Sequence, residues 1–150
     1  MSSGTEFLTR EQLDIAVDLW LSNEPLAITT HGDINTWDVS GIDDFSDLFS
    51  GAWDGPSNFN SDISNWDVSS GKNFSGMFYY AISFDQDISN WDVSSGTNFM
   101  GMFHNADAFN QDIGSWDVSS GTVFNGMFIL TDAFNQDISS WDVSSGTKFK

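Results

Sequence analysis

The sequence has no cysteine, only two prolines, and only four lysine and arginine residues among its 150. Without cysteine there is no disulfide bond and no thiolate metal site, so the redox compartment cannot be inferred. The few basic residues stand against 22 aspartates and glutamates, which gives a formal charge of −18 at pH 7. A surface with this charge repels nucleic acid and anionic lipid and attracts cations and basic partners. We therefore expect no nucleic-acid partner.

Long apolar runs are also missing. No stretch approaches the ~18–20 apolar residues that span a bilayer, and residues 1–7 lack the basic and apolar regions of a signal peptide. We therefore expect no membrane insertion of this chain. Aromatic residues, in contrast, make up 15% of the sequence. This content argues against disorder, because disordered chains carry little apolar surface.

A unit of about 25 residues recurs along most of the chain. Its tryptophans are spaced by 29, 25, 25 and 25 residues: Trp37, Trp66, Trp91, Trp116 and Trp141. The word Asp-Ile-Ser-Asn-Trp-Asp-Val-Ser-Ser-Gly at 87–96 returns with few changes at 62–71, 112–121 and 137–146. In the first unit, four extra residues lengthen the loop at 51–58, which carries Trp53. Trp53 is therefore a candidate exposed contact residue.

The pattern inside one unit predicts its fold. The motif Ile88-x-x-Trp91-x-Val93 places Trp and Val on one face of a strand. Three apolar residues after the Ser-Ser-Gly turn have the spacing of a short helical turn: Phe99, Met102 and Phe103. One strand and one helical turn per unit is the leucine-rich-repeat plan. We therefore predict an α/β repeat solenoid over 33–150, a right-handed coil with a parallel sheet and about four and a half repeats.

The first 32 residues have a different pattern, that of a leader and a cap helix. Thr9 and Gln12 have the spacing of a capping box. Apolar residues then follow at helical spacing: Leu13, Ala16, Val17, Trp20 and Leu21. We predict an amphipathic helix over 6–22 that ends at Asn23 to Pro25 and covers the core of the first unit. At the other end the chain stops halfway through a unit, and we expect exposed core residues there: Trp141, Val143 and Phe149.

The repeat resembles that of BspA-type leucine-rich-repeat surface proteins, also known as a mycoplasma lipoprotein repeat. The matching words are Trp91–Phe103 and Phe109–Ile113, with their counterparts in the other units. The resemblance implies an extracellular or cell-surface protein, with adhesion among the known roles, and it brings no catalytic residues. Where the family has Val five residues after Trp and Met three further on, this chain has Gly96 and Phe99. We interpret this pair as a coupled repacking, in which the Phe ring fills the space left by the Val.

Stacking of the units predicts two rows of aspartates about 4.8 Å apart. One row lies on the open face: Asp38, Asp67, Asp92, Asp117 and Asp142. Its members Asp67, Asp92, Asp117 and Asp142, together with Trp53, are our candidate binding face. The second row is flanked by Gln86, Gln111 and Gln136: Asp62, Asp87, Asp112 and Asp137. Neighbouring carboxylates repel, so something must offset the repulsion. Ca²⁺ bound by the second row is one alternative, and local Asx-type hydrogen bonds to Ser hydroxyls or backbone amides are the other.

No pattern of an enzyme is present. His31 and His104 lie in different units without a second His or Cys in phase, so neither a zinc site nor a catalytic base is expected. We expect no cofactor apart from the calcium alternative. The sequence favours a non-catalytic binding or adhesion protein whose partner is a protein or glycan on a surface. The alternatives are a self-assembling structural protein, a homo-oligomer through the C-terminal end, and ice binding by the row Thr97, Thr122 and Thr147, which Lys72 interrupts.

Overall fold

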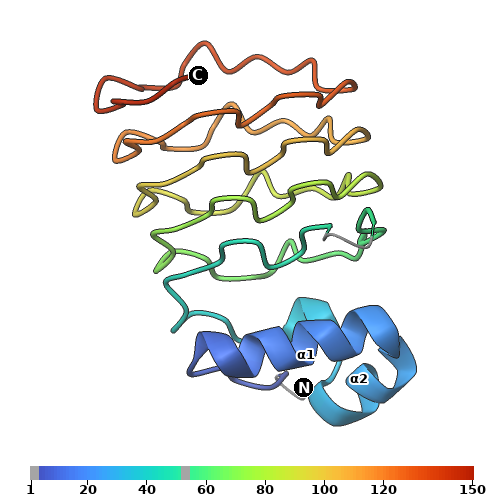
Figure 1. Ribbon diagram of the computed structural model, residues 1–150. Coiled ribbons are helices and arrows are strands. Elements are labelled where there is room, and N and C mark those ends of the chain that lie inside the picture. Colours follow the sequence, from blue (N-terminus) through green and yellow to red (C-terminus); the bar gives the residue numbers. More distant parts are fainter. Residues whose placement is uncertain (1–3, 52–54) are drawn as a thin grey trace.

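The computed structural model describes residues 4–51 and 55–150. In these residues the helices lie close to the N-terminus: α1 (Arg10–Ser22), α2 (Glu24–His31) and the 3-10 helix η1 (Ile34–Thr36). Both α-helices lie across one end of the molecule, and the rest of the chain extends away from them (Figure 1). No helix in the described ranges is long and apolar enough to cross a bilayer.

Helix α1 is the amphipathic helix that the sequence predicts, although it begins at Arg10. The capping box is present: the Thr9 hydroxyl accepts a hydrogen bond from the Gln12 amide at 3.2 Å, and the Gln12 side chain accepts one from the Thr9 amide at 3.3 Å. Four of the five predicted apolar residues are buried: Leu13, Ala16, Val17 and Trp20. Leu21, the fifth, is 48% exposed. The buried face therefore ends one residue before Leu21.

Asn23 separates α1 from a second helix that the sequence analysis missed. Its amide donates to Leu19 O at 2.7 Å and so ends α1, while its side chain accepts from the Leu26 amide at 3.2 Å and so begins α2. Pro25 lies in the first turn of α2, where the missing N–H has no helical partner to lose. The segment Asn23 to Pro25 therefore joins two helices instead of ending the helical region.

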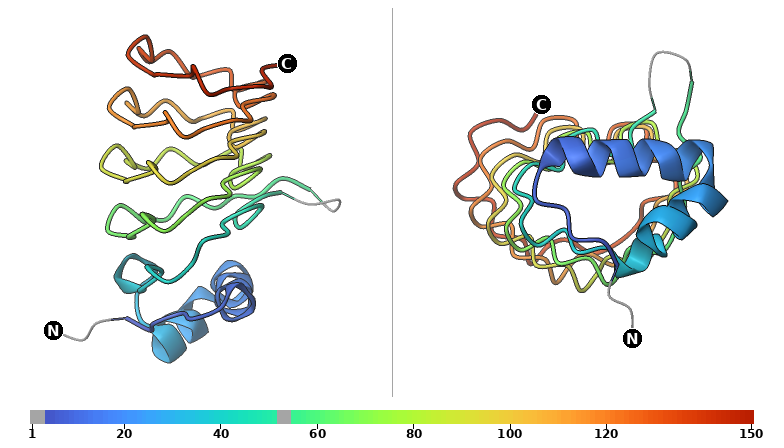
Figure 2. Two further views of the ribbon diagram at one scale, coloured as in Figure 1. Left: turned by 90° about the vertical axis from the view of Figure 1, so that its left-hand side faces the viewer. Right: turned by 90° about the horizontal axis from the view of Figure 1, so that it is seen from below.

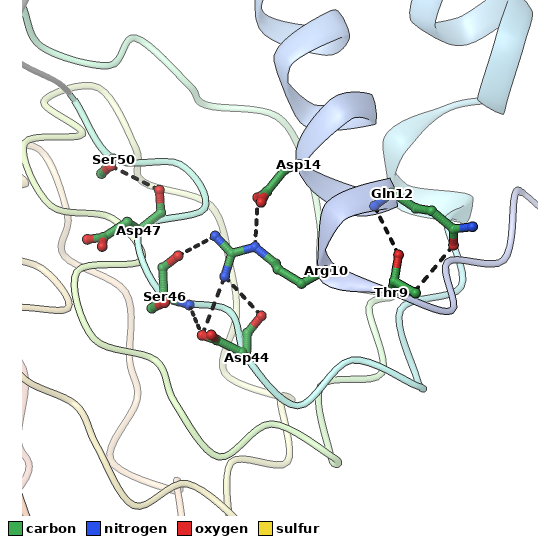
Figure 3. A network of polar contacts seen from close by, with 8 residues as sticks. All are labelled: Thr9, Arg10, Gln12, Asp14, Asp44, Ser46, Asp47 and Ser50. Atoms are coloured by element: carbon green, nitrogen blue, oxygen red, sulfur yellow. Dashed lines mark hydrogen bonds and ion pairs between the residues drawn. The ribbon is translucent and has the colours of Figure 1, made fainter.

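Arg10 fastens α1 to the turn that follows the first Trp-Asp-Val word (Figure 3). Its guanidinium pairs with Asp14 at 2.7 Å, donates to Asp44 O at 3.1 Å, and donates to Ser46 O. The equivalent carbonyls of the next unit are Asn73 O and Ser75 O. They accept hydrogen bonds from the Phe45 and Asp47 amides of the preceding unit. Arg10 therefore supplies the donors that a preceding unit would otherwise provide.

From Trp37 onward the chain winds in successive turns that lie one above another (Figures 1 and 2). We call each turn a coil. Neighbouring coils are joined by backbone hydrogen bonds between residues 24 or 25 positions apart, such as Phe74 N to Asn98 O at 2.8 Å and Thr97 N to Lys72 O at 2.8 Å. The predicted period of the repeat is thus the length of one coil.

The predicted leucine-rich-repeat solenoid with a parallel sheet is wrong. Residues 4–51 and 55–150 contain no strand and no sheet. Coils meet instead at isolated parallel bridges, such as Asn73 with Asn98 and Asn98 with Val123. The expected strand around Trp91 does not form because local bonds take up its backbone groups: Trp91 N donates to Ile88 O at 3.1 Å, and Gly96 N donates to Val93 O at 2.8 Å.

The predicted helical turn at Phe99 to Phe103 is also absent. Gly101 has φ +60 and Asn105 has φ +57, and left-handed residues at this spacing interrupt a right-handed helix. Alternate amides of this segment donate to the next coil: Phe99 to Val123, Gly101 to Asn125, Phe103 to Met127, and Asn105 to Ile129. The apolar spacing that suggested a helix therefore reflects a series of consecutive turns. The side chains of Phe99, Met102 and Phe103 are buried in the core, as a helical turn would also have placed them.

The core is built from columns of identical aromatic rings. Phe74, Phe99 and Phe124 stack with ring centroids 5.6 Å apart, and Phe78 and Phe103 do the same. The tryptophans of successive coils also stack, for example Trp91 on Trp116 at 6.5 Å. Four of the five are at most 4% exposed, as expected for core residues: Trp37, Trp66, Trp91 and Trp116. Each indole N–H of the later coils donates to the backbone carbonyl of the isoleucine three residues before the tryptophan of the preceding coil, as Trp116 does to Ile88 at 3.0 Å.

Candidate functional site

The first predicted row of aspartates lies on the surface. All five carboxylates are on exposed residues: Asp38, Asp67, Asp92, Asp117 and Asp142. In each coil the Asp side chain accepts a hydrogen bond from the amide of the serine two residues later, as Asp92 does from Ser94 at 3.0 Å. In the first four coils the serine hydroxyl donates to the same oxygen, at 2.6 Å in Asp92 and Ser94. The local Asx alternative is therefore the arrangement that the structure has in this row.

These bonds affect the protonation of the row. The Ser94 hydroxyl, followed by the Ser94 amide, holds the pKa of Asp92 below its usual value. Serines in the same relation lower the pKa of Asp38, Asp117 and Asp142. The charge on Asp117 acts on Asp92 in the opposite direction, because neighbouring carboxylates in the row repel each other. The five carboxylates of the row therefore share one repeated conformation, each engaged through Oδ1.

The second row has the same turn. Asp62, Asp87 and Asp137 accept the amides of Ser64, Ser89 and Ser139, and Asp112 accepts that of Gly114, all at 2.9–3.0 Å. The flanking glutamines are directed elsewhere, because Gln86 Nε2 donates to Asn60 and Gln111 Nε2 donates to Asp85 in the preceding coil. Among the residues that the structure describes, no three or more His, Cys, Asp or Glu side chains lie close enough together to hold a metal ion.

A third polar row was missed by the sequence analysis. It consists of Asn60, Asp85 and Asn110. The side-chain oxygen of each accepts two hydrogen bonds from the next coil, one from the backbone amide of the residue 25 positions later and one from the side chain of the glutamine after it. Asp85, for example, accepts from the Asn110 amide and from Gln111 Nε2, both at 2.9 Å. This row joins coils, whereas the two aspartate rows bond within a coil. The repeated Asn-Gln pair before Asp-Ile was the signal that could have identified it.

The C-terminal coil leaves apolar side chains exposed, as predicted. Val143 is 37% exposed and Phe149 is 56% exposed, while Trp141 is half-buried. With Phe124 and Met127 they line a hollow of about 410 Å³. Trp53, the remaining predicted contact residue, lies outside the described residues.

The two histidines lie far apart. His31 packs against Phe7 and Trp37, with ring centroids 5.7 and 5.8 Å away. His104 packs against Tyr79 at 5.0 Å. The threonine row proposed for ice binding is tied into the stack, because Thr97, Thr122 and Thr147 each donate a hydroxyl to the preceding coil at 3.1–3.2 Å.

A groove of about 310 Å³, also missed from the sequence, lies along one edge of the stack. Its floor includes two glycines with positive φ, Gly76 and Gly101. Its walls are formed by side chains from four coils: Asp47, Ser75, Tyr79, Met100, His104 and Asn125. Burial raises the pKa of the Asp47 carboxyl, and the nearby charges of Arg10 and Asp44 have smaller, opposed effects. The groove combines an acidic group, aromatic faces and a thioether.

Comparison with known proteins places this chain in a family. The model of a family described as "Mycoplasma protein of unknown function, DUF285" matches residues 23–141. No curated protein and no solved structure matches the chain. The matched residues run from Asn23, the N-cap of α2, to Trp141, so they include the edge groove and every residue of the two aspartate rows except Asp142. Because the match covers most of the chain, this protein belongs to the DUF285 family.

Proposed function

We propose that this protein is a non-catalytic binding protein of the cell surface or extracellular space, and that its exposed row of aspartates contacts a cationic surface on a partner protein or glycan. The resemblance of its repeat to BspA-type surface proteins supports the location. The formal charge of −18 supports the kind of partner, because such a charge attracts basic groups and accelerates their association.

One observation carries the proposal. The same Asp–Ser turn recurs in five coils, so five carboxylates are held in one orientation on an exposed face, among them Asp67, Asp92 and Asp117. Their Oδ1 atoms are engaged by serine, which leaves the Oδ2 atoms for a partner. A partner with several basic groups can contact several coils at once, and such multivalent binding compensates for weak single contacts.

The experiment is a binding screen of the immobilised chain against surface glycans, matrix proteins and polylysine, repeated with Asp67→Asn/Asp92→Asn/Asp117→Asn. Asparagine keeps the turn, because its carbonyl oxygen can accept the same serine amide, but it removes the charge. The matched control, Asp18→Asn/Asp43→Asn/Asp107→Asn, removes three charges at exposed positions outside the row. Loss of binding in the first variant alone supports the proposal. Equal loss in both variants, or binding by neither the wild type nor any variant, contradicts it.

The exposed apolar side chains of residues 141–149 favour a second candidate function, self-association. Phe149 and Val143 expose apolar surface beside a hollow, and such surface is often covered by another chain. Two copies that meet through this end would close as a dimer. Light scattering across a dilution series tests this: a mass that doubles in the wild type and stays monomeric in Phe149→Asp supports it, and a monomer at all concentrations removes it.

A further inference from the structure

Three surface positions along one edge of the stack carry a different residue in each coil of residues 66–140. The other positions of the coil are identical or vary less, as Lys72, Thr97 and Thr122 do. The residue after the first core Phe is Ser46, Ser75, Met100 or Asn125; the residue after the second is Ser50, Tyr79, His104 or Ile129; and the next is Gly51, Tyr80, Asn105 or Leu130. Stacking tolerates serine, glycine and asparagine at these positions, so it does not require the large side chains.

These large side chains are exposed and continuous from coil to coil. Tyr79 is 40% exposed and Met100 is 48% exposed. Tyr79 contacts His104 in the next coil, with ring centroids 5.0 Å apart, and Tyr80 N donates to His104 O at 2.7 Å. Ile129 and Leu130 extend the apolar surface into the following coil. A protein of charge −18 therefore presents a connected aromatic and aliphatic surface at this edge.

Backbone geometry shows that this surface is kept despite a cost. Tyr80 and Leu130 have φ +56, a left-handed conformation in which a bulky side chain is strained. Asn105 occupies the equivalent position of the coil between them and has φ +57, and asparagine tolerates the left-handed conformation. Strain of this kind is found where a side chain has a role other than stability.

The groove within this surface indicates what it binds. Two acceptors in its wall have no donor among the described residues: no hydrogen bond from them engages the Asp47 carboxylate, and the side-chain oxygen of Asn125 is buried without a partner among them. Tyr79 and His104 supply flat faces on which a guanidinium can stack, and Met100 adapts to irregular apolar shapes. The complement of this wall is an arginine side chain with apolar neighbours.

We propose that the edge groove, lined by Asp47, Tyr79, Met100, His104 and Asn125, binds a segment of a partner protein in which arginine alternates with apolar residues. This inference rests on the proposed binding function and adds a second, selective surface to it. The aspartate row attracts basic partners in general, whereas the edge groove distinguishes arginine flanked by apolar residues from isolated basic groups. Aromatic and Met side chains are the groups that most often carry such selective contacts.

The test uses three labelled peptides of equal length: arginine alternating with leucine, arginine alternating with serine, and glutamate alternating with leucine. Fluorescence anisotropy at an ionic strength that screens surface charges gives their affinities. The edge variant Tyr79→Ser/Tyr80→Asn/Met100→Ser takes each residue from the same position of another coil, so the stack is retained. Its melting curve is recorded as the control for folding. The aspartate-row variant Asp67→Asn/Asp92→Asn/Asp117→Asn is measured beside it.

We expect the arginine–leucine peptide to bind the wild type most tightly, to bind the edge variant about tenfold or more weakly, and to bind the aspartate-row variant nearly as well as the wild type. Equal affinity for wild type and edge variant would overturn the inference. Loss in the aspartate-row variant alone would also overturn it, while supporting the proposed function. Failure of the peptide to bind the wild type, or binding of a neutral cello-oligosaccharide that the edge variant loses, would show that the groove has another ligand or none.

Discussion

The ring of Phe99 fills the space that a side chain on Gly96 would need, because a Cβ atom built on Gly96 would lie 2.5 Å from Phe99 Cζ and 2.9 Å from Val93 O. The same relation holds in the neighbouring coils, between Gly71 and Phe74 and between Gly121 and Phe124. The coupled repacking inferred from the sequence is therefore the arrangement in the core. Glycine is required here for space, since φ at Gly96 is not positive.

Gly96→Ala should reduce the free energy of unfolding by about 1–3 kcal/mol, because the added methyl group displaces a fully buried ring. Urea unfolding measures the change. Gly41→Ala is the control, since its Cβ would meet only Phe7 O, at 3.7 Å. The double variant Gly96→Val/Phe99→Met should lose less than the sum of its single changes. Additive losses would mean that the two positions are not coupled.

Leu130→Asn should stabilise the protein by about 1 kcal/mol, because asparagine tolerates the left-handed conformation better than leucine. The melting temperature should rise accordingly. Ile129→Asn removes a similar exposed apolar side chain from a residue without positive φ, and it should give no such gain. Equal gains in both variants would attribute the effect to lost surface hydrophobicity instead of backbone strain.

Stability should fall with pH below about 4, which is the ordinary pKa of an aspartate in an unfolded chain. The pKa of Asp92 is lowered in the folded state, first by the Ser94 hydroxyl. Such a group contributes stability above its unfolded pKa and loses it as pH falls through the folded pKa. Ser94→Ala should move the NMR titration of Asp92 upward toward its ordinary value, with no comparable shift at Asp38. An unmoved Asp92 titration would show that the hydroxyl does not lower the pKa.

Arg10→Lys should cost about 1–3 kcal/mol, because an ammonium group cannot donate to the carbonyls of Asp44 and Ser46 in the manner of a planar guanidinium. Asp14→Asn, which removes only the pairing within α1, should cost about 0.3–0.5 kcal/mol. Urea unfolding of the two variants makes the comparison. If Arg10→Lys is no more harmful than Asp14→Asn, the contact between α1 and the first coil does not depend on the guanidinium.

Calcium chloride should raise the melting temperature no more than sodium chloride of equal ionic strength. Salt of either kind screens repulsion within the aspartate rows, such as that of Asp117 on Asp92. The Oδ1 atoms of both rows already accept local hydrogen bonds. A rise specific to calcium, reversed by chelator, would support the calcium alternative for Asp62, Asp87, Asp112 and Asp137.

The sequence was sufficient for features that depend on a single periodicity or a single turn. The capping box at Thr9 and the buried tryptophans follow from residue type and spacing, and the Asx bonds of the aspartates were one of the two alternatives that the spacing left open. The sheet was predicted wrongly because alternation of Trp91 and Val93 fits a strand and also fits two consecutive turns. In this chain the serine and aspartate bonds favour the turns.

The edge groove was not predictable because no residue in it has a distinctive spacing. Tyr79 and His104 occupy the same position of successive units but differ in residue type, Met100 occupies another position, and the three come together only when the coils stack. The signal was present in the sequence as a departure from repetition. It becomes visible only once the repeated positions have been assigned to the core.

Along the edge groove the backbone bonds between coils point toward the C-terminal end, as the amides of Phe45, Phe74, Phe99 and Phe124 show. The bonds of the neighbouring line, such as Thr97 N to Lys72 O and Thr122 N to Thr97 O, point the other way. Peptide dipoles within one such line add, as they do along a helix. The carbonyls of Asp44 and Ser46 are the negative end of the edge line, so the guanidinium of Arg10 places a cation where that line favours positive charge.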